Sequence, residues 1–140
     1  METPPETLIE TLSTLSILIT RFPAHVSDPS LTPQPLPATA PLLSHPRPAV
    51  RKRAILTLSQ YVPVAPRELV DDLLQIHILP FLAPSANVEK QRTTVHLVAA
   101  IIRQSPQQLS SVYNDIIPGI VTAVQRDDDE LREGCLQVRK

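Results

Sequence analysis

Four basic side chains gather in one short stretch of the chain: Arg47, Arg51, Lys52 and Arg53. No aromatic residue lies between them, so the stretch lacks rings on which nucleic-acid bases could stack. Guanidinium and ammonium groups donate hydrogen bonds to carboxylates, phosphates or carbonyls. Three interpretations remain open: a solvated helix face in which Arg51 contacts carboxylates or carbonyls of neighbouring segments, a surface that binds an acidic protein, and, least favoured, a nucleic-acid site.

A nucleophile could come from the single cysteine, Cys135, if a nearby histidine or cation lowered its thiol pKa. The four histidines are His25, His45, His77 and His96, and no Ser, Cys or carboxylate recurs at a fixed distance from them. We therefore expect Cys135 to be a small buried hydrophobe and assign no catalytic residue. A small cysteine hydrolase remains a remote alternative.

An acidic run, Asp127–Glu130, offers four adjacent carboxylates. Calcium loops need spaced oxygen ligands and a glycine at the turn, and the run has neither. Carboxylates are favoured in the first turn of a helix, where backbone N–H groups are exposed. The run therefore predicts a helix start, and the sequence indicates no metal site, no cofactor and no small-molecule substrate.

Composition favours a single helical domain spanning residues 1–140. Hydrophobic residues make up 42% of the 140, aromatic residues 3%, and there are only two glycines, which is few for β-hairpins or phosphate loops. The net charge of −1 disfavours nucleic acid as a partner. With no basic leader, no long apolar run and a lone cysteine, we expect neither secretion nor a membrane span, but a cytoplasmic or nuclear protein.

Proline marks an internal repeat. Pro41, Pro80 and Pro118 each lie within an apolar stretch, 39 and then 38 residues apart. A proline inside a helix removes one backbone donor and displaces a carbonyl, so we expect a kink at each position.

Arginine marks the same repeat independently, because Arg51, Arg92 and Arg132 follow the prolines at intervals of 41 and 40 residues. A period near 40 with two helices per unit is typical of HEAT and armadillo arrays. The sequence thus predicts an all-α HEAT-repeat solenoid of about three to four antiparallel helix pairs. A degenerate repeat opens it near Leu8, and the last repeat is truncated.

Helical periodicity gives approximate bounds for the elements. The predicted helices cover residues 6–21, 37–44, 48–62, 67–83, 88–104, 108–125 and 128–139. Between the first two, residues 23–37 are rich in proline and predict a mobile extended loop.

Three sequence blocks resemble the cullin-associated, neddylation-dissociated (Cand) family: Pro48–Arg53, Ala99–Gln104 and Asp127–Glu133. Their order and approximate spacing match over roughly residues 8–137. The resemblance implies a piece, about a tenth, of a long HEAT solenoid that wraps cullin–RING ubiquitin-ligase cores and promotes exchange of their substrate receptors. It also implies binding to cullins that lack their ubiquitin-like modification, and it places the piece in the N-terminal arch, which lies toward the cullin C-terminal region and the RING subunit.

Two features depart from that family pattern: the proline-rich stretch 28–37 stands where a regular helix is expected, and the chain ends at Lys140 inside a predicted helix, which suggests truncation. We expect a non-enzymatic protein-binding scaffold whose partner is a cullin–RING core, with Arg47, Arg51, Lys52 and Arg53 as candidate contacts. A generic HEAT or armadillo scaffold, of the transport-receptor or phosphatase-scaffold type, is the alternative.

Overall fold

The computed structural model describes residues 4–31, 33–83, 87–107, 109 and 113–124. Within these ranges the regular elements are all helical, so the predicted all-α class is confirmed. In chain order the elements are α1 (Pro5–Arg21), α2 (Pro23–Val26), α3 (Pro35–Thr39), η1 (Ala40–Ser44), α4 (Pro48–Tyr61), η2 (Val62–Val64), α5 (Arg67–Asp72), η3 (Leu73–Ile78), η4 (Leu79–Leu82), α6 (Val88–Gln104) and α7 (Tyr113–Val124).

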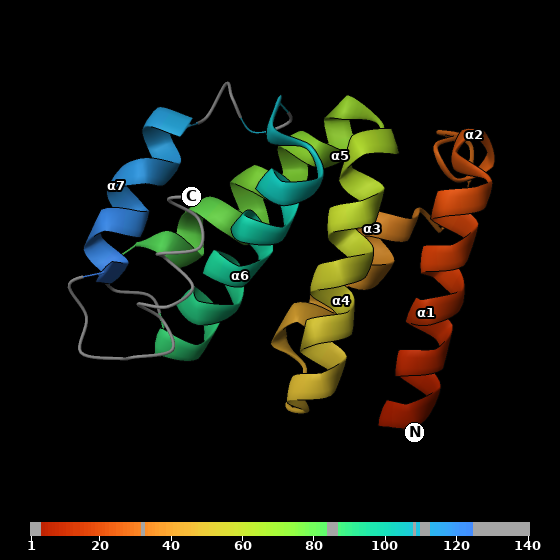
Figure 1. Cartoon of the computed structure of the whole chain (residues 1–140), viewed down its shortest axis with the longest axis horizontal. Helices are drawn as coiled ribbons and strands as arrows, with labels where there is room; N and C mark the ends of the chain where they lie inside the picture. The colour runs from red at the N-terminus through yellow and green to blue at the C-terminus, as the bar shows by residue number, and fades with distance from the viewer. Residues whose placement is uncertain (1–3, 32, 84–86, 108, 110–112, 125–140) are drawn as a thin grey trace.

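The three longest helices lie side by side as a row in which α4 occupies the middle (Figure 1). Helix α4 packs against α1 on one side and against α6 on the other. The shorter segments form a second set of contacts: η1 packs on α4 and α6, while η4 packs on α6 and α7. Each helix of the row is therefore supported by the short helical segments that precede or follow it in the sequence.

The buried positions of α4 and α6 are separated by the same interval as the arginine markers of the repeat. Helix α4 buries Val50, Ala54 and Leu58, one helical turn apart, and α6 buries the residues 41 positions later, Gln91, Val95 and Ala99. Apolar side chains at such intervals line one face of a helix, and burying a Val or Leu stabilises the fold by about 1.5–3 kcal/mol. Successive helices thus use equivalent faces for packing.

A buried hydroxyl pair joins α1 to α4. Ser16 and Thr57 are 4% and 1% exposed, and their hydroxyl oxygens lie 2.9 Å apart. The Thr57 hydroxyl also donates to the Leu12 carbonyl at 3.3 Å, so Ser16 is the donor within the pair. Because these buried polar groups are paired, they fix the register of α1 on α4 without an unsatisfied donor.

The helical geometry changes at two of the three marker prolines. Pro41 is the second residue of the 3₁₀ segment η1, and Pro80 is the second residue of the 3₁₀ segment η4, which directly follows the π-helical η3. In η3 the Leu79 N–H donates to the Leu74 carbonyl, five residues back, a wide turn that makes room for the Pro80 ring. Pro118 differs, because α7 continues through it.

Element bounds agree best where periodicity is strong: 6–21, 48–62 and 88–104 were predicted, and α1, α4 and α6 match them within one residue. The proline-rich segment 23–37 differs from an extended loop, since it contains α2 and the start of α3. Proline opens both helices, because its fixed φ suits the first helical position. Helix α7 covers Tyr113–Val124, within the predicted range 108–125; residues 108, 110–112 and 125 of that range, and the whole predicted helix 128–139, lie outside the described residues.

Turns in this segment are closed by side chains. The Gln34 amide nitrogen donates to the carbonyls of Asp28, Pro29 and Leu31 at 2.9–3.2 Å. The Asp28 carboxylate accepts from the backbone and hydroxyl of Ser30, and these bonds lower the pKa of Asp28. The segment is a hydrogen-bonded turn between two helices.

Gly119 allows α7 to approach η4 closely. A Cβ atom at this position would lie 2.7 Å from the Leu82 Cβ, closer than real side chains come. We expect Gly119→Ala to destabilise the fold by about 1–3 kcal/mol through overpacking, even though Ala favours helix over Gly. Urea unfolding would measure this, with Ile117→Ala at the 55% exposed neighbour as the control. A Gly119→Ala variant as stable as the parent would contradict the close packing.

Candidate functional site

The four basic residues predicted to bind a partner gather at the start of α4. Arg47 is the N-cap residue, and Arg51, Lys52 and Arg53 occupy the second turn. Arg47 and Lys52 are exposed, whereas Arg51 and Arg53 are half-buried. The structure therefore divides this basic cluster into two solvent-facing cations and two that are partly packed.

Helix α4 places little negative charge beside the four cations of this basic cluster. A helix N-terminus carries partial positive charge, which favours carboxylates and disfavours cations by about 0.3–1 kcal/mol each at exposed sites. The first turn of α4 has no acidic residue, and its N-cap side chain makes no capping bond. Four cations at the positive end of a helix therefore produce a field that an external carboxylate would relieve.

Arg51 has a structural contact as well. Its Nη1 donates to the carbonyls of His45 and Pro46 at 2.7 and 3.1 Å, and the Arg47 N–H donates to the His45 ring at 3.0 Å. Arg51 thus holds the loop before its own helix, rather than contacting a neighbouring repeat. Its repeat equivalents are Arg92, which is half-buried, and Arg132, which lies outside the described residues.

A groove of about 440 Å³ opens beside the basic cluster. One wall is formed by Leu43, Ser44, His45, Pro46, Pro48 and Arg51. The other wall comes from the start of α6 and consists of Asn87, Glu89, Lys90 and Thr93. Segments more than 35 residues apart in the sequence therefore meet in what we call the η1–α6 groove.

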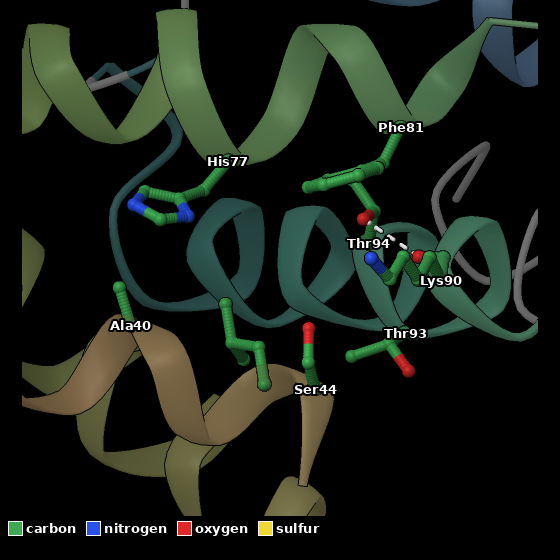
Figure 2. Close-up of a pocket in the computed structure, with 8 residues that line it drawn as sticks. Ala40, Ser44, His77, Phe81, Lys90, Thr93 and Thr94 are labelled. Atoms are coloured by element: carbon green, nitrogen blue, oxygen red, sulfur yellow. Dashed lines mark hydrogen bonds between the residues drawn. The ribbon is translucent and has the colours of Figure 1, made fainter. Parts of the chain in front are cut away.

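A small recess of about 20 Å³ continues this groove inward. Figure 2 shows side chains of η1, of the η3–η4 segment and of α6 pointing into it. The Lys90 ammonium lies 5.1 Å from the centre of the Phe81 ring, a cation–π distance, and the Thr94 hydroxyl donates to the Lys90 carbonyl at 2.8 Å. The Lys90–Phe81 contact joins α6 to η4 at the inner end of the groove, whereas the Thr94 bond lies within α6.

His77 borders the recess, and burial lowers its pKa below the usual imidazole value of about 6.5. The folded state therefore favours neutral His77, and the unfolded chain binds more protons just below pH 6.5. Stability should be full above about pH 6.5 and should fall as the pH drops towards the folded pKa. The urea concentration at the unfolding midpoint should fall between pH 7.5 and pH 5.5, and it should fall less in His77→Gln than in the parent or in His25→Gln. An equal slope in all three would contradict this role.

What the described residues offer chemically is a set of hydrogen-bond donors around an open groove. Within the described residues, no group of three His, Cys, Asp or Glu side chains is placed to hold a metal ion, and no helix is long and apolar enough to cross a membrane. Cys135 and the acidic run 127–130 lie outside the described residues. Guanidinium, ammonium and hydroxyl donors around an open groove can bind a carboxylate-bearing surface.

Comparison with known proteins identifies relatives over almost the entire chain. It is 30% identical over 131 residues to mouse cullin-associated NEDD8-dissociated protein 2 and 34% identical over 134 residues to the Drosophila melanogaster protein 1 of that name. Each alignment covers 92% of this chain. The chain matches a segment of the cullin-associated NEDD8-dissociated (Cand) family.

The chain spans about a tenth of the length of these Cand relatives. A third Cand protein, protein 1 of Dictyostelium discoideum, is 30% identical over 100 residues, which is 69% of this chain and 8% of that protein. No family model matches the chain. The resemblance found in the three sequence blocks is therefore confirmed by alignments that extend well beyond them.

Sequence reasoning identified the basic cluster but missed the Lys90 side of the groove. A usable signal was the 41-residue period, which aligns Pro46–Lys52 with Asn87–Thr93. Helices packed at equivalent faces bring equivalent positions to the same end of the row, so this alignment predicts that the two stretches lie close together.

Proposed function

We propose that this chain is a non-enzymatic protein-binding segment that engages the core of a cullin–RING ubiquitin ligase. The observation that carries the proposal is the similarity over 92% of the chain to proteins that are named for their association with cullins. Because the chain spans a tenth of those proteins, it corresponds to one part of their length and binding surface.

The proposed architecture is a HEAT-like solenoid in which residues 1–140 form one array of three to four helix pairs. Three features support it: the period near 40, the row α1–α4–α6, and the short segments packed along that row. In such arrays each unit contacts only its neighbours, which leaves an extended surface for a partner.

The proposed contact surface is the basic cluster, with the exposed Arg47 and Lys52 as its leading residues. Opposite charges across an interface accelerate association and suppress wrong partners. A carboxylate-rich patch on the cullin–RING core would also offset the unfavourable charge at the start of α4. Arg51 contributes less directly, since its guanidinium already holds the preceding loop.

A direct binding measurement tests the proposal. The full 140-residue chain is immobilised and exposed to purified cullin–RING core, either unmodified or carrying NEDD8. We expect saturable binding of the unmodified core and weaker binding of the NEDD8-carrying form. Absence of binding to either form would contradict a cullin-binding role for this segment.

A further inference from the structure

We propose that the η1–α6 groove binds an extended acidic peptide segment with a small aliphatic side chain as its anchor. The inference rests on the proposed protein-binding function and adds the chemistry of the bound segment. At about 440 Å³ the groove falls within the range of roughly 300–1,000 Å³ typical of ligand sites.

Charge selects an acidic occupant. The groove lining includes two cations, Arg51 and Lys90, and one carboxylate, Glu89. The remaining cations of the basic cluster stand on the adjoining turns of α4 and add to the positive field. A carboxylate entering the groove thus meets attraction from more than one side, whereas a basic segment meets repulsion.

Both cations are held in place before a ligand arrives. Arg51 is bonded to two loop carbonyls, and Lys90 lies over the Phe81 ring. The guanidinium carries further N–H donors on Nε and Nη2, and the ammonium carries three. Since these long side chains already have restricted rotamers, binding a carboxylate costs less conformational entropy.

Side chains, rather than the end of α6, must hold the carboxylate. The Asn87 side chain accepts from the backbone N–H groups of Glu89 and Lys90, at 2.9 and 3.3 Å. Two of the donors at this helix end are therefore already bonded to protein. This arrangement favours recognition by Arg51 and Lys90.

The inner recess sets the size of the anchor. The groove and the recess share the side chains of Leu43, Ser44, Lys90 and Thr93, so they form one continuous surface. The recess extends between Ala40 and Phe81 but measures only about 20 Å³ (Figure 2). That volume accepts a group the size of a water molecule or methyl, and it excludes an aromatic ring.

Nucleic acid fits these features less well. Single-stranded binding sites combine positive charge with aromatic faces on which bases stack. The recess is lined by two rings, Phe81 and His77, and the Lys90 ammonium already lies over the Phe81 ring. A peptide with carboxylates and small side chains matches the available surface better.

Peptides of defined composition can test the inference with the full chain. The probe is a ten-residue peptide in which Glu and Asp alternate with Ala and Val. Two variants serve as comparisons, one with Gln and Asn in place of the acids and one with Phe in place of Ala and Val. Binding is followed by amide NMR shifts of the protein. We expect shifts at Ser44, Lys90 and Thr93 with the first peptide, and affinities at least about tenfold weaker with both variants.

Matched charge reversals separate the groove from the total charge of the chain. Lys90→Glu should weaken binding of the acidic peptide at least about tenfold, whereas Arg21→Glu, an equal charge change in the last turn of α1 and outside both the groove lining and the basic cluster, should change it less than about twofold. Both residues are exposed, and circular dichroism verifies that both variants fold.

Three outcomes would overturn the inference: no shift with the acidic peptide, equal effects of the two reversals, or stronger binding of a twelve-nucleotide oligouridine at the same amides. Peptide binding without capture of a cullin–RING core would support the groove and contradict the proposed function. Capture of a cullin–RING core without peptide binding would support the proposed function and contradict the inference about the groove.

Discussion

The double substitution Arg47→Glu/Lys52→Glu should weaken capture of an unmodified cullin–RING core at least about tenfold, because like charges facing each other across an interface cost several kcal/mol. Both side chains are exposed at the start of α4, where acidic residues suit the helix dipole better than basic ones. The variant should therefore fold at least as stably as the parent. Surface binding kinetics in low and high salt would show the loss mainly in the association rate.

A matched control places the same change of charge at the other end of the helices. Arg67 opens α5 and Arg103 lies in the last turn of α6, and both are exposed. Arg67→Glu/Arg103→Glu should leave cullin capture within about twofold of the parent. If both double variants lose affinity equally, total charge rather than the basic cluster drives binding, and the proposed contact surface is wrong.

The substitution Ser16→Asp should release α1 from the row while α4 and α6 remain folded. The carboxylate would be buried against Thr57, whose hydroxyl hydrogen is already donated to the Leu12 carbonyl, so the α1–α4 contact should lose about 3 kcal/mol or more. In a row of helices each unit depends on its neighbours alone, and the damage should stay local. Amide hydrogen exchange should rise throughout α1 and change little in α6.

Thr14→Asp provides the comparison, since Thr14 is on the exposed side of the same helix. It should leave the exchange of α1 close to that of the parent. If Ser16→Asp instead unfolds α6 together with α1, the helices share a single cooperative centre, and the proposed solenoid architecture is wrong.

Periodic apolar residues determined how well the sequence predicted the helices. In α6, a 17-residue helix, a capping Asn87 and regular burial on one face agree, and both bounds were predicted correctly. The α5–η3–η4 segment was also predicted as helical, but its division into α, π and 3₁₀ geometry follows from how the chain accommodates Pro80 in three dimensions. Such accommodation depends on neighbouring elements, which a local pattern does not contain.

Prolines were interpreted mainly as breakers, which explains the differences in the first forty residues. Pro23 and Pro35 open short helices instead, as Pro5 and Pro48 open long ones. A proline at the first helical position loses no hydrogen bond, because that N–H has no partner within the helix. A proline therefore predicts the start of a helix when periodic apolar residues follow it, and the end of a helix when they precede it.

The candidate site was predictable in part. The four clustered cations are visible in the sequence, whereas the loop contact of Arg51 and the position of Lys90 across the groove depend on how η1, α4 and α6 pack. Only the repeat period connects those segments, and it gives their register without giving side-chain contacts.

Hydrogen exchange of the full chain, free and bound to an unmodified cullin–RING core, tests the central claim most directly. A protein-binding segment that uses the basic cluster should show slower exchange on binding in residues 45–53, with the largest protection at the start of α4. Protection confined to α1 or α7, or no change in any segment when the core is in excess, would contradict the account.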